Sequence, residues 1–140
     1  MIPDTVTVLG TFRAMNETWR QEAHQRMKAM AEAMATSMGA QCDFFINVGY
    51  PFLENDPEVT SRLRELAVEY VGEAQVVDLD LWMAAEDFAW YTREIPGSFY
   101  RLGVRNEAQG IIHSVHTPGF DIDETALTLG AGFMAWSMLG

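Results

Sequence analysis

Thr5-Val-Thr-Val-Leu-Gly-Thr-Phe-Arg13 opens the region of the chain that decides the fold. Its β-forming residues alternate, and the two-residue period places Val6 and Val8 on one face of an expected strand. Residues 17–38 follow without proline or glycine and predict a long helix, and residues 41–48 predict a second strand. Strand, helix and strand make half of a two-layer α/β sandwich, which leaves a helix face and sheet edges for something else to cover.

The long helix has clear ends and one apolar face. Asn16 is a good N-cap, and Gly39 is placed to end the helix. Apolar side chains recur at spacings of three and four residues, which predicts an amphipathic helix; they are Trp19, Ala23, Met27, Met30 and Met34. This methionine-rich stripe favours core packing or a subunit contact, with a flexible binding surface as the alternative.

Residues 49–57 are rich in turn formers and predict the boundary between two segments, 1–52 and 53–140. Beyond the boundary, helices alternate with short strands, the pattern of an α/β layer. The expected helices are 57–71, 85–95 and 124–139, and the expected strands are 75–79 and 98–104. The last helix is apolar nearly all round, so it is expected to be largely buried.

Composition excludes several classes of partner. The 140 residues carry a formal net charge of -11 and a pI of about 4.5, which argues against binding to nucleic acid or an anionic membrane. Cys42 is the only cysteine, so no internal disulfide can form. The sequence has no signal peptide and no apolar run long enough to span a membrane, so a cytoplasmic protein is expected.

Two histidines lie three residues apart in a loop before the last helix. His113 and His116 are candidate metal ligands, although a lone histidine in such a loop is usually surface polarity. Asp121, Asp123 and Glu124 could add ligands, or they could be acids that favour the start of the helix.

A second acidic pair, Glu86 and Asp87, opens the short helix. Adjacent carboxylates can act as a general base and a metal ligand, or simply as first-turn helix acids. His24 is expected to face solvent, and Cys42 is expected to be a small core residue. These residues alone are too few for a complete hydrolytic metal site.

Three blocks taken together resemble the C-terminal part of the metal-dependent amidohydrolases. That group includes hippurate hydrolases, N-acyl-amino-acid amidohydrolases and plant auxin-conjugate hydrolases, and it is similar to aminoacylases and carboxypeptidase-G-like metallopeptidases. The blocks, which follow in the same order as in that family, are Ile2-Pro-Asp-Thr-Val-Thr-Val-Leu-Gly-Thr-Phe-Arg13, Ala85-Glu-Asp-Phe-Ala-Trp-Tyr91 and Val115-His-Thr-Pro-Gly-Phe-Asp-Ile-Asp-Glu124.

The resemblance implies that His116 is the family's last metal-binding histidine, holding a zinc or manganese ion. It places Glu86, Asp87 and His113 on the substrate side. The family's other ligands and its general base lie in upstream motifs that this chain lacks, so a bound metal is not required of the chain alone. Two departures are Ala84-Ala85 in place of a glycine and Thr117 in place of a serine.

The implied fold is α/β: half of a two-layer lid (dimerisation) domain, residues 1–52, then the C-terminal segment of a zinc-peptidase-like catalytic domain, residues 53–140. The implied function is that of a fragment of an enzyme hydrolysing N-acyl amino acids or related amides, inactive as an isolated chain and dimeric through the lid. The alternatives are a non-catalytic dimerising module, or one half of a split hydrolase that needs a separate N-terminal chain.

Overall fold

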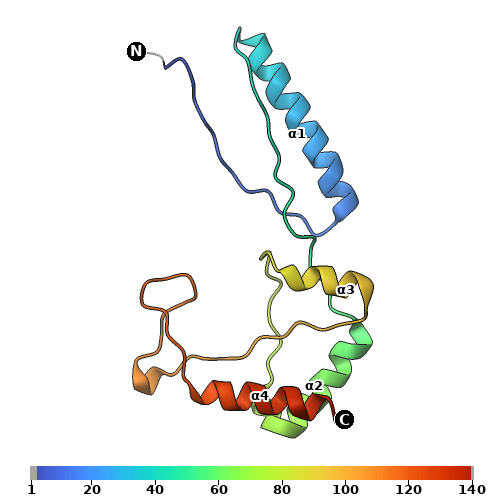
Figure 1. Cartoon of the computed structure of the whole chain (residues 1–140), viewed down its shortest axis with the longest axis vertical. Helices are drawn as coiled ribbons and strands as arrows, with labels where there is room; N and C mark the ends of the chain where they lie inside the picture. Colours follow the sequence, from blue (N-terminus) through green and yellow to red (C-terminus); the bar gives the residue numbers. More distant parts are fainter. Residues whose placement is uncertain (1–2, 140) are drawn as a thin grey trace. The chain divides into compact units, whose positions relative to one another are not determined.

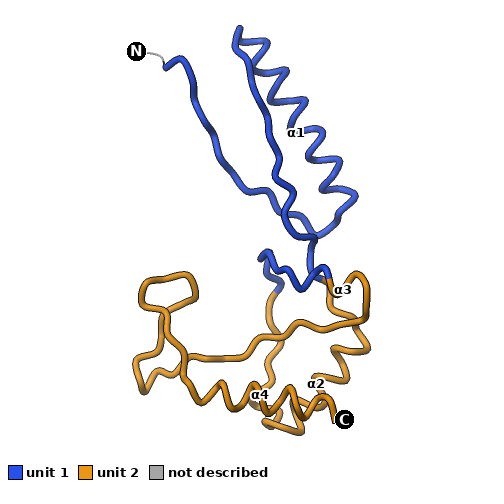
Figure 2. Tube along the Cα trace, in the orientation of Figure 1, with its two compact units in different colours: residues 1–53, 81–90 blue, residues 54–80, 91–140 orange. Residues whose placement is uncertain are grey.

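The computed structural model describes residues 3–139. It divides into two compact units (Figure 2): unit 1 is Met1–Leu53 with Leu81–Trp90, and unit 2 is Glu54–Asp80 with Tyr91–Gly140. The chain first passes from unit 1 to unit 2 after Leu53, one residue from the expected boundary. Residues 81–90, expected in the second segment, belong to unit 1. The expected segments also include residues 1, 2 and 140, which lie outside the described residues. Their assignment as lid and catalytic segments stays a prediction.

Unit 1 is built on helix α1, Glu17–Ser37 (Figure 1), which confirms the expected helix. The Asn16 side chain accepts a hydrogen bond of 2.8 Å from the Trp19 amide and satisfies one of the free N–H groups of the first turn. Gly39 follows the helix with φ 75°, a backbone region that glycine enters without a steric cost.

The first turn of α1 is tied to the segment that returns from its far end. Arg20 donates to the carboxylate of Glu17 and to the backbone oxygen of Tyr50, the latter at 3.0 Å. Glu17 in turn accepts a 3.1 Å hydrogen bond from the Phe52 amide. These bonds bring residues 50–52 back to the start of the helix.

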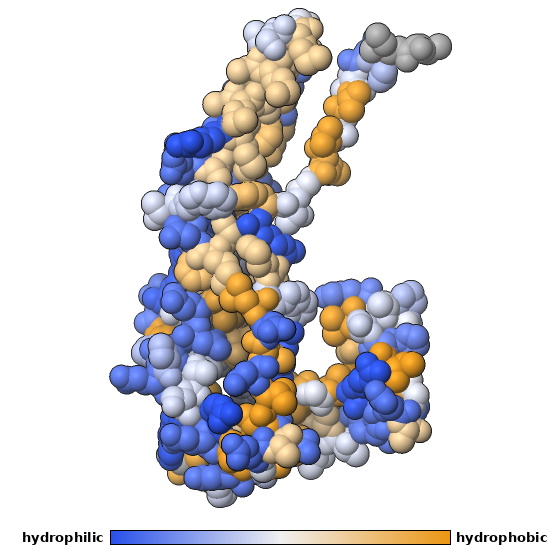
Figure 3. Space-filling model, turned by 180° about the vertical axis from the view of Figure 1, so that it is seen from behind, coloured by the Kyte–Doolittle hydropathy of each residue, from blue (hydrophilic) through white to orange (hydrophobic). Residues whose placement is uncertain are grey.

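The apolar face of α1 is not buried within the described residues of unit 1. Met30 is 66% exposed and Met34 63%. Phe12 lies against Trp19 with ring centroids 5.5 Å apart, but no residue of α1 is buried, so the stripe is not packed as a core within the described residues. The alternative of a subunit contact stays a prediction. The N-terminal extended segment is also uncovered (Figure 3), and Leu9 is 91% exposed.

Unit 2 begins with helix α2, Pro57–Val71, at the expected position. Asp56 caps it by accepting hydrogen bonds from the amides of Glu58 and Val59, and proline occupies the first helical position, where no N–H is needed. Gly72 ends the helix with φ 88°.

Helix α4, Thr125–Ser137, packs against α2. The buried residues of the two helices are Leu66, Ala126 and Phe133. The Phe133 ring lies 5.9 Å from the Tyr70 ring of α2 and 5.3 Å from the Tyr100 ring, measured between centroids. Trp136 also lies near Tyr70, at a centroid distance of 6.2 Å, yet it is exposed. Other large side chains of α4 that remain exposed are Leu127, Leu129 and Met134. The expectation that α4 is largely buried is wrong, since α2 is the one described helix packed on it.

The remaining elements are short: η1 Glu73–Gln75, η2 Asp87–Trp90, α3 Tyr91–Glu94 and η3 Glu107–Gln109. Between residues 3 and 139, the segments expected as strands form no ladder, and the first residue of the expected strand 75–79 lies in η1. In the described chain, β pairing is limited to the bridge between Asn106 and Ile111. The α/β class therefore stays a prediction that depends on pairing partners. No described helix combines the length and apolar character needed to cross a membrane.

Candidate functional site

The histidines lie in a loop that starts from a tight hairpin in unit 2. Asn106 and Ile111 exchange two backbone hydrogen bonds of 2.9 Å each. The Asn106 side-chain oxygen accepts a 3.2 Å hydrogen bond from the Gln109 amide, and Gly110 turns the chain with φ 76°. This hairpin fixes the first end of residues 107–122, which we call the histidine loop.

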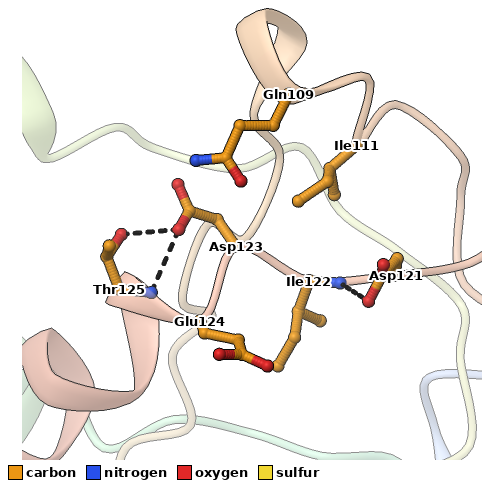
Figure 4. Close-up of a pocket in the computed structure, with 7 residues that line it drawn as sticks. All are labelled: Gln109, Ile111, Asp121, Ile122, Asp123, Glu124 and Thr125. Atoms are coloured by element: carbon orange, nitrogen blue, oxygen red, sulfur yellow. Dashed lines mark hydrogen bonds between the residues drawn. The ribbon is translucent and has the colours of Figure 1, made fainter.

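Asp123 fixes the second end of the loop. Its amide donates to the Val104 carbonyl at 2.9 Å, and its carboxylate accepts a 2.6 Å hydrogen bond from the Asn106 side-chain nitrogen. The other carboxylate oxygen accepts from the Thr125 amide at 3.0 Å and the Thr125 hydroxyl at 2.7 Å (Figure 4). Asp123 thus binds the first residue of α4, while Glu124, at the N-cap position, makes no side-chain capping bond.

These partners also change the acidity of Asp123. The hydrogen bond from Asn106, followed by the two from Thr125, lowers the pKa of the Asp123 carboxyl, and slight desolvation opposes them. Each of these donors stabilises the ionised form. In the closed loop, the Asp123 carboxylate is therefore charged at neutral pH.

His116 stands at the far side of the loop in an unusual backbone conformation. Its φ of 65° is the one positive value recorded for a non-glycine residue in the described part of the chain. Thr117 donates from its hydroxyl to the Ser114 carbonyl at 2.8 Å, and the Phe120 amide donates to the Thr117 carbonyl at 3.1 Å. Two local hydrogen bonds thus hold the turn while the His116 side chain remains exposed.

His113 is placed differently from His116. Its ring lies against Gly119: a Cβ added to that glycine would approach the ring to 2.8 Å at Cδ2. The structure therefore brings His113 onto the backbone of the loop, where it packs across the turn that carries His116. This geometry is that of a packing contact, while the substrate-side role expected for His113 stays a prediction.

A shallow hollow of about 360 Å³ adjoins the end of the loop (Figure 4), lined by Gln109, Ile111, Asp121, Ile122, Asp123, Glu124 and Thr125. Two of its acids are engaged locally: Asp121 accepts a 2.8 Å hydrogen bond from the Ile122 amide, and Asp123 accepts from Asn106 and Thr125. Residues 3–139 contain no group of three or more His, Cys, Asp or Glu side chains that could hold a metal ion. His113 and His116 are both exposed, so the described residues offer two single imidazoles rather than a complete metal centre.

Glu86 and Asp87 belong to unit 1, whereas both histidines belong to unit 2. The Glu86 carboxylate accepts a 3.4 Å hydrogen bond from the Phe88 amide, as a helix-start acid does, and Asp87 is exposed. His24, expected to face solvent, is half-buried, and its ring lies in a T-shaped arrangement with Phe12 at a centroid distance of 6.2 Å.

One further prediction differs from the structure, and one residue of the site was not predicted. Cys42 is half-buried rather than a core residue. Sequence reasoning missed Asn106, whose side chain joins the two ends of the histidine loop. The one local signal for it was Asn-Glu-Ala-Gln-Gly, residues 106–110, a turn former four residues before a glycine.

Comparison with known proteins places these features in a family. Residues 5–137 match the sequence profile of Peptidase family M20/M25/M40. The chain is 34% identical over 137 residues to IAA-amino acid hydrolase ILR1-like 6 of Arabidopsis thaliana, a match that covers 95% of this chain and 30% of that protein. It is 33% identical over 132 residues to thermostable carboxypeptidase 2 of Saccharolobus solfataricus, covering 94% of this chain and 33% of the relative.

A bacterial relative is similar to the chain to the same extent. The chain is 34% identical over 134 residues to the N-acetyl-L-cysteine deacetylase of Bacillus subtilis, covering 96% of this chain and 30% of that protein. The chain therefore spans about a third of the length of the curated relatives it matches.

Proposed function

Because the chain belongs to Peptidase family M20/M25/M40, we propose that it carries the last metal-binding histidine of an amidohydrolase that cleaves N-acyl amino acids or related amides. The family assignment made from the three sequence blocks is confirmed by these matches. The relatives named above are hydrolases by name, acting on an IAA–amino acid conjugate, on N-acetyl-L-cysteine or as carboxypeptidases.

The observation that carries the proposal is the presentation of His116. The turn from Ser114 to Phe120 leaves the imidazole exposed, and neutral imidazole nitrogen is a common ligand of zinc and manganese. A divalent ion in such a hydrolase polarises the amide carbonyl and lowers the pKa of a bound water. The contribution of this chain is one ligand atom held by a fixed turn, together with Glu86 and Asp87 as substrate-side groups.

The described residues do not complete a metal site, so the remaining ligands and the general base must come from outside them. We therefore expect the chain alone to hydrolyse no N-acyl amino acid with added zinc or manganese. Robust hydrolysis by the isolated chain would contradict the proposal. Such a result would mean that it builds a whole active site by itself, for instance between two copies.

A chimera tests the positive half of the proposal. The segment of the Bacillus subtilis deacetylase that matches this chain would be replaced by residues 1–140, and both bound metal and hydrolysis of N-acetyl-L-cysteine would be measured. We expect activity with the native segment, loss of metal and activity in His116→Ala, and retention of both in the matched control His113→Ala. Full metal content and activity in His116→Ala would overturn the assignment.

We further propose that the chain forms a homodimer through unit 1. Apolar residues on residues 5–12 and 41–50 are highly exposed, with Val8 at 87% and Phe45 at 90%, and their backbone groups have no ladder partner in the described chain. Pairing with a second copy would cover both. Sedimentation of the chain should give a dimer, and a monomer at high concentration would refute this proposal.

Two alternative functions, a non-catalytic dimerising module and a split hydrolase, are distinguished by the chimera and by a complementation test. A dimer whose chimera is inactive under all metals would favour a non-catalytic dimerising module. A chain that becomes active only when a separately expressed N-terminal segment is added would favour a split hydrolase. We also propose a cytoplasmic location, which fits an unpaired Cys42, and cell fractionation would test it.

A further inference from the structure

Asn106 uses both polar atoms of its side chain on two different parts of unit 2. Its oxygen accepts from the Gln109 amide at 3.2 Å, inside the hairpin. Its nitrogen donates to the Asp123 carboxylate at 2.6 Å, across the whole histidine loop. One amide group therefore joins the start of the loop to the start of α4.

The backbone bond from Asp123 to Val104 and the Asn106–Ile111 bridge also hold the two ends, but the loop between them makes few contacts. Residues 112–121 are all exposed, whereas Asn106, Ile111 and Asp123 are half-buried. The bonds recorded inside residues 112–121 are local ones within the turn that follows Ser114. An exposed loop with so few contacts samples many conformations unless its ends are fixed.

We infer that Asn106 is a positioning residue: its hydrogen bond to Asp123 closes the histidine loop and holds His116 in the left-handed turn from which it would reach a metal ion. This inference rests on the proposed role of His116 as a ligand. We call the Asn106–Asp123 pair the latch. It reaches His116 through the loop backbone, without contact between Asn106 and the imidazole.

A ligand on a closed loop costs less to order when the metal binds. Holding a side chain in its binding geometry beforehand removes the entropy of ordering the loop from the free energy of binding. The conformation of His116 adds to the need for a latch, because a non-glycine residue with φ 65° is disfavoured and persists where neighbouring structure imposes it. The low pKa of Asp123 agrees with a closed latch, since it reports donors directed at the carboxylate.

The hydrogen-bond pattern of the latch permits a swap experiment. In the single variant Asn106→Asp, two carboxylates would face each other where a donor now meets an acceptor. In the double variant Asn106→Asp/Asp123→Asn, the donor lies on the other side of the pair and the net charge of the chain is unchanged. Every other bond of the pair needs an acceptor oxygen at each position, which both residues still supply.

Two NMR readouts in the full chain follow the loop without metal or substrate. Positive φ at His116 gives a strong intraresidue NOE between its amide and Hα protons, and hydrogen exchange at the Ile111 and Phe120 amides reports opening. We expect Asn106→Asp to weaken the NOE and to speed exchange by about tenfold, the size of effect that loss of one charge-assisted hydrogen bond produces. The double variant should restore both readouts to within about threefold of the native chain.

Controls separate the latch from charge and from general stability. Ala108→Glu adds the same charge to the hairpin without touching the latch, and it should leave both readouts unchanged. Asn106→Ala removes the donor without adding a charge, and it should open the loop to a smaller extent. The melting of α2 and α4, followed by circular dichroism, should change little in all of these variants.

Two outcomes would overturn the inference. One is a native NOE and native exchange in Asn106→Asp; the other is a double variant as open as the single one. Either result leaves the proposed metal role of His116 untouched, since that role depends on metal content and hydrolysis in the chimera. Conversely, a chimera with no need of His116 would refute the proposed function while the latch could still be observed.

Discussion

No residue of α1 in unit 1 is buried, whereas α4 in unit 2 buries Ala126 and Phe133 beside α2. The two helices also differ in what their sequences supply. Three i,i+3 or i,i+4 ion pairs lie along α1, between Glu17 and Arg20, Glu22 and Arg26, and Lys28 and Glu32. Helix α4 contains Gly130 and Gly132, which are poor helix formers, and no charged residue.

The difference teaches that helical structure in this chain has two origins. In α1 it comes from local terms, namely the cap, the ion pairs and the run of helix-forming residues, each worth a fraction of a kcal/mol to about 1 kcal/mol. In α4 it depends on tertiary contact with α2. Substitutions should therefore act locally in unit 1 and cooperatively in unit 2.

The largest effect is expected for Phe133→Ala. Deleting a buried phenylalanine costs about 3–5 kcal/mol in a packed core, enough to disrupt the contact between α2 and α4. Its counterpart in unit 1 is Trp19→Ala, which removes a side chain that is 54% exposed and should cost less than about 1 kcal/mol. Hydrogen exchange resolved by residue would check the comparison, and equal losses of protection in the two units would refute it.

A smaller effect is expected for Gly132→Ala. A Cβ at this position would lie 2.1 Å from the Tyr70 hydroxyl oxygen and 3.2 Å from Cζ, and such overpacking typically costs about 1–3 kcal/mol. Removing that hydroxyl in Gly132→Ala/Tyr70→Phe should recover most of the loss in a thermal melt.

The matched control for this steric argument is Gly130→Ala. Its Cβ would meet the end of the flexible Leu102 side chain at 2.8 Å, so a small shift can accommodate it. The gain in helix propensity, about 1 kcal/mol, offsets that shift, and little net change in the melt is expected. A loss as large as that of Gly132→Ala would mean that the Tyr70 contact is not the cause.

In unit 1, Asn16→Ala should cost about 1 kcal/mol, because the Trp19 amide loses its acceptor. The effect should be limited to faster hydrogen exchange in the first turn of α1. Asn16→Asp keeps an acceptor and should restore protection. Loss of helix along the whole of α1 would show that this helix depends on its cap far more than its local sequence indicates.

The smallest effect concerns pH and the Asp123 carboxylate. Since its folded pKa is lowered, the stabilisation it gives is complete above the ordinary aspartate pKa of about 3.9 and is lost as the pH falls through the lower folded value. Exchange at the Phe120 amide, corrected for its intrinsic pH dependence, should therefore report loop opening in that acidic range. Asp123→Asn, which keeps an acceptor for Thr125 but does not titrate there, should abolish this dependence.

Local signals in the sequence predict where helices begin and end, but not which other elements pack against them. The expected bounds of α1 and α2 were correct to within one residue, and Asn16, Asp56, Gly39 and Gly72 lie at the ends of these helices. The burial of α4 was predicted wrongly, and for α1 the subunit contact stays a prediction, because an apolar face indicates that a partner is needed without showing whether this chain supplies it. The same limit applies to the expected strands, because a β-strand forms only when a neighbouring strand supplies its hydrogen-bond partners.

The candidate site divides in the same way. His113 and His116 could be picked out by residue type and spacing, and the resemblance selected His116. The contact of His113 with Gly119 and the bond from Asn106 to Asp123 join residues that are not sequence neighbours, so no short motif predicts them. The left-handed conformation of His116 was equally hidden, because only a few per cent of non-glycine residues adopt it and no local motif marks this one.

The exposed extended segments of unit 1 also bear on how self-association of this protein depends on salt concentration. A chain with a net charge of -11 repels its own copies, and that repulsion weakens as the Debye length falls from about 30 Å at 0.01 M salt to about 3 Å at 1 M. Apolar contact through residues 5–12 and 41–50 is not screened in this way. Added salt should therefore strengthen self-association, which light scattering across a salt series would detect, whereas association through ion pairs would weaken.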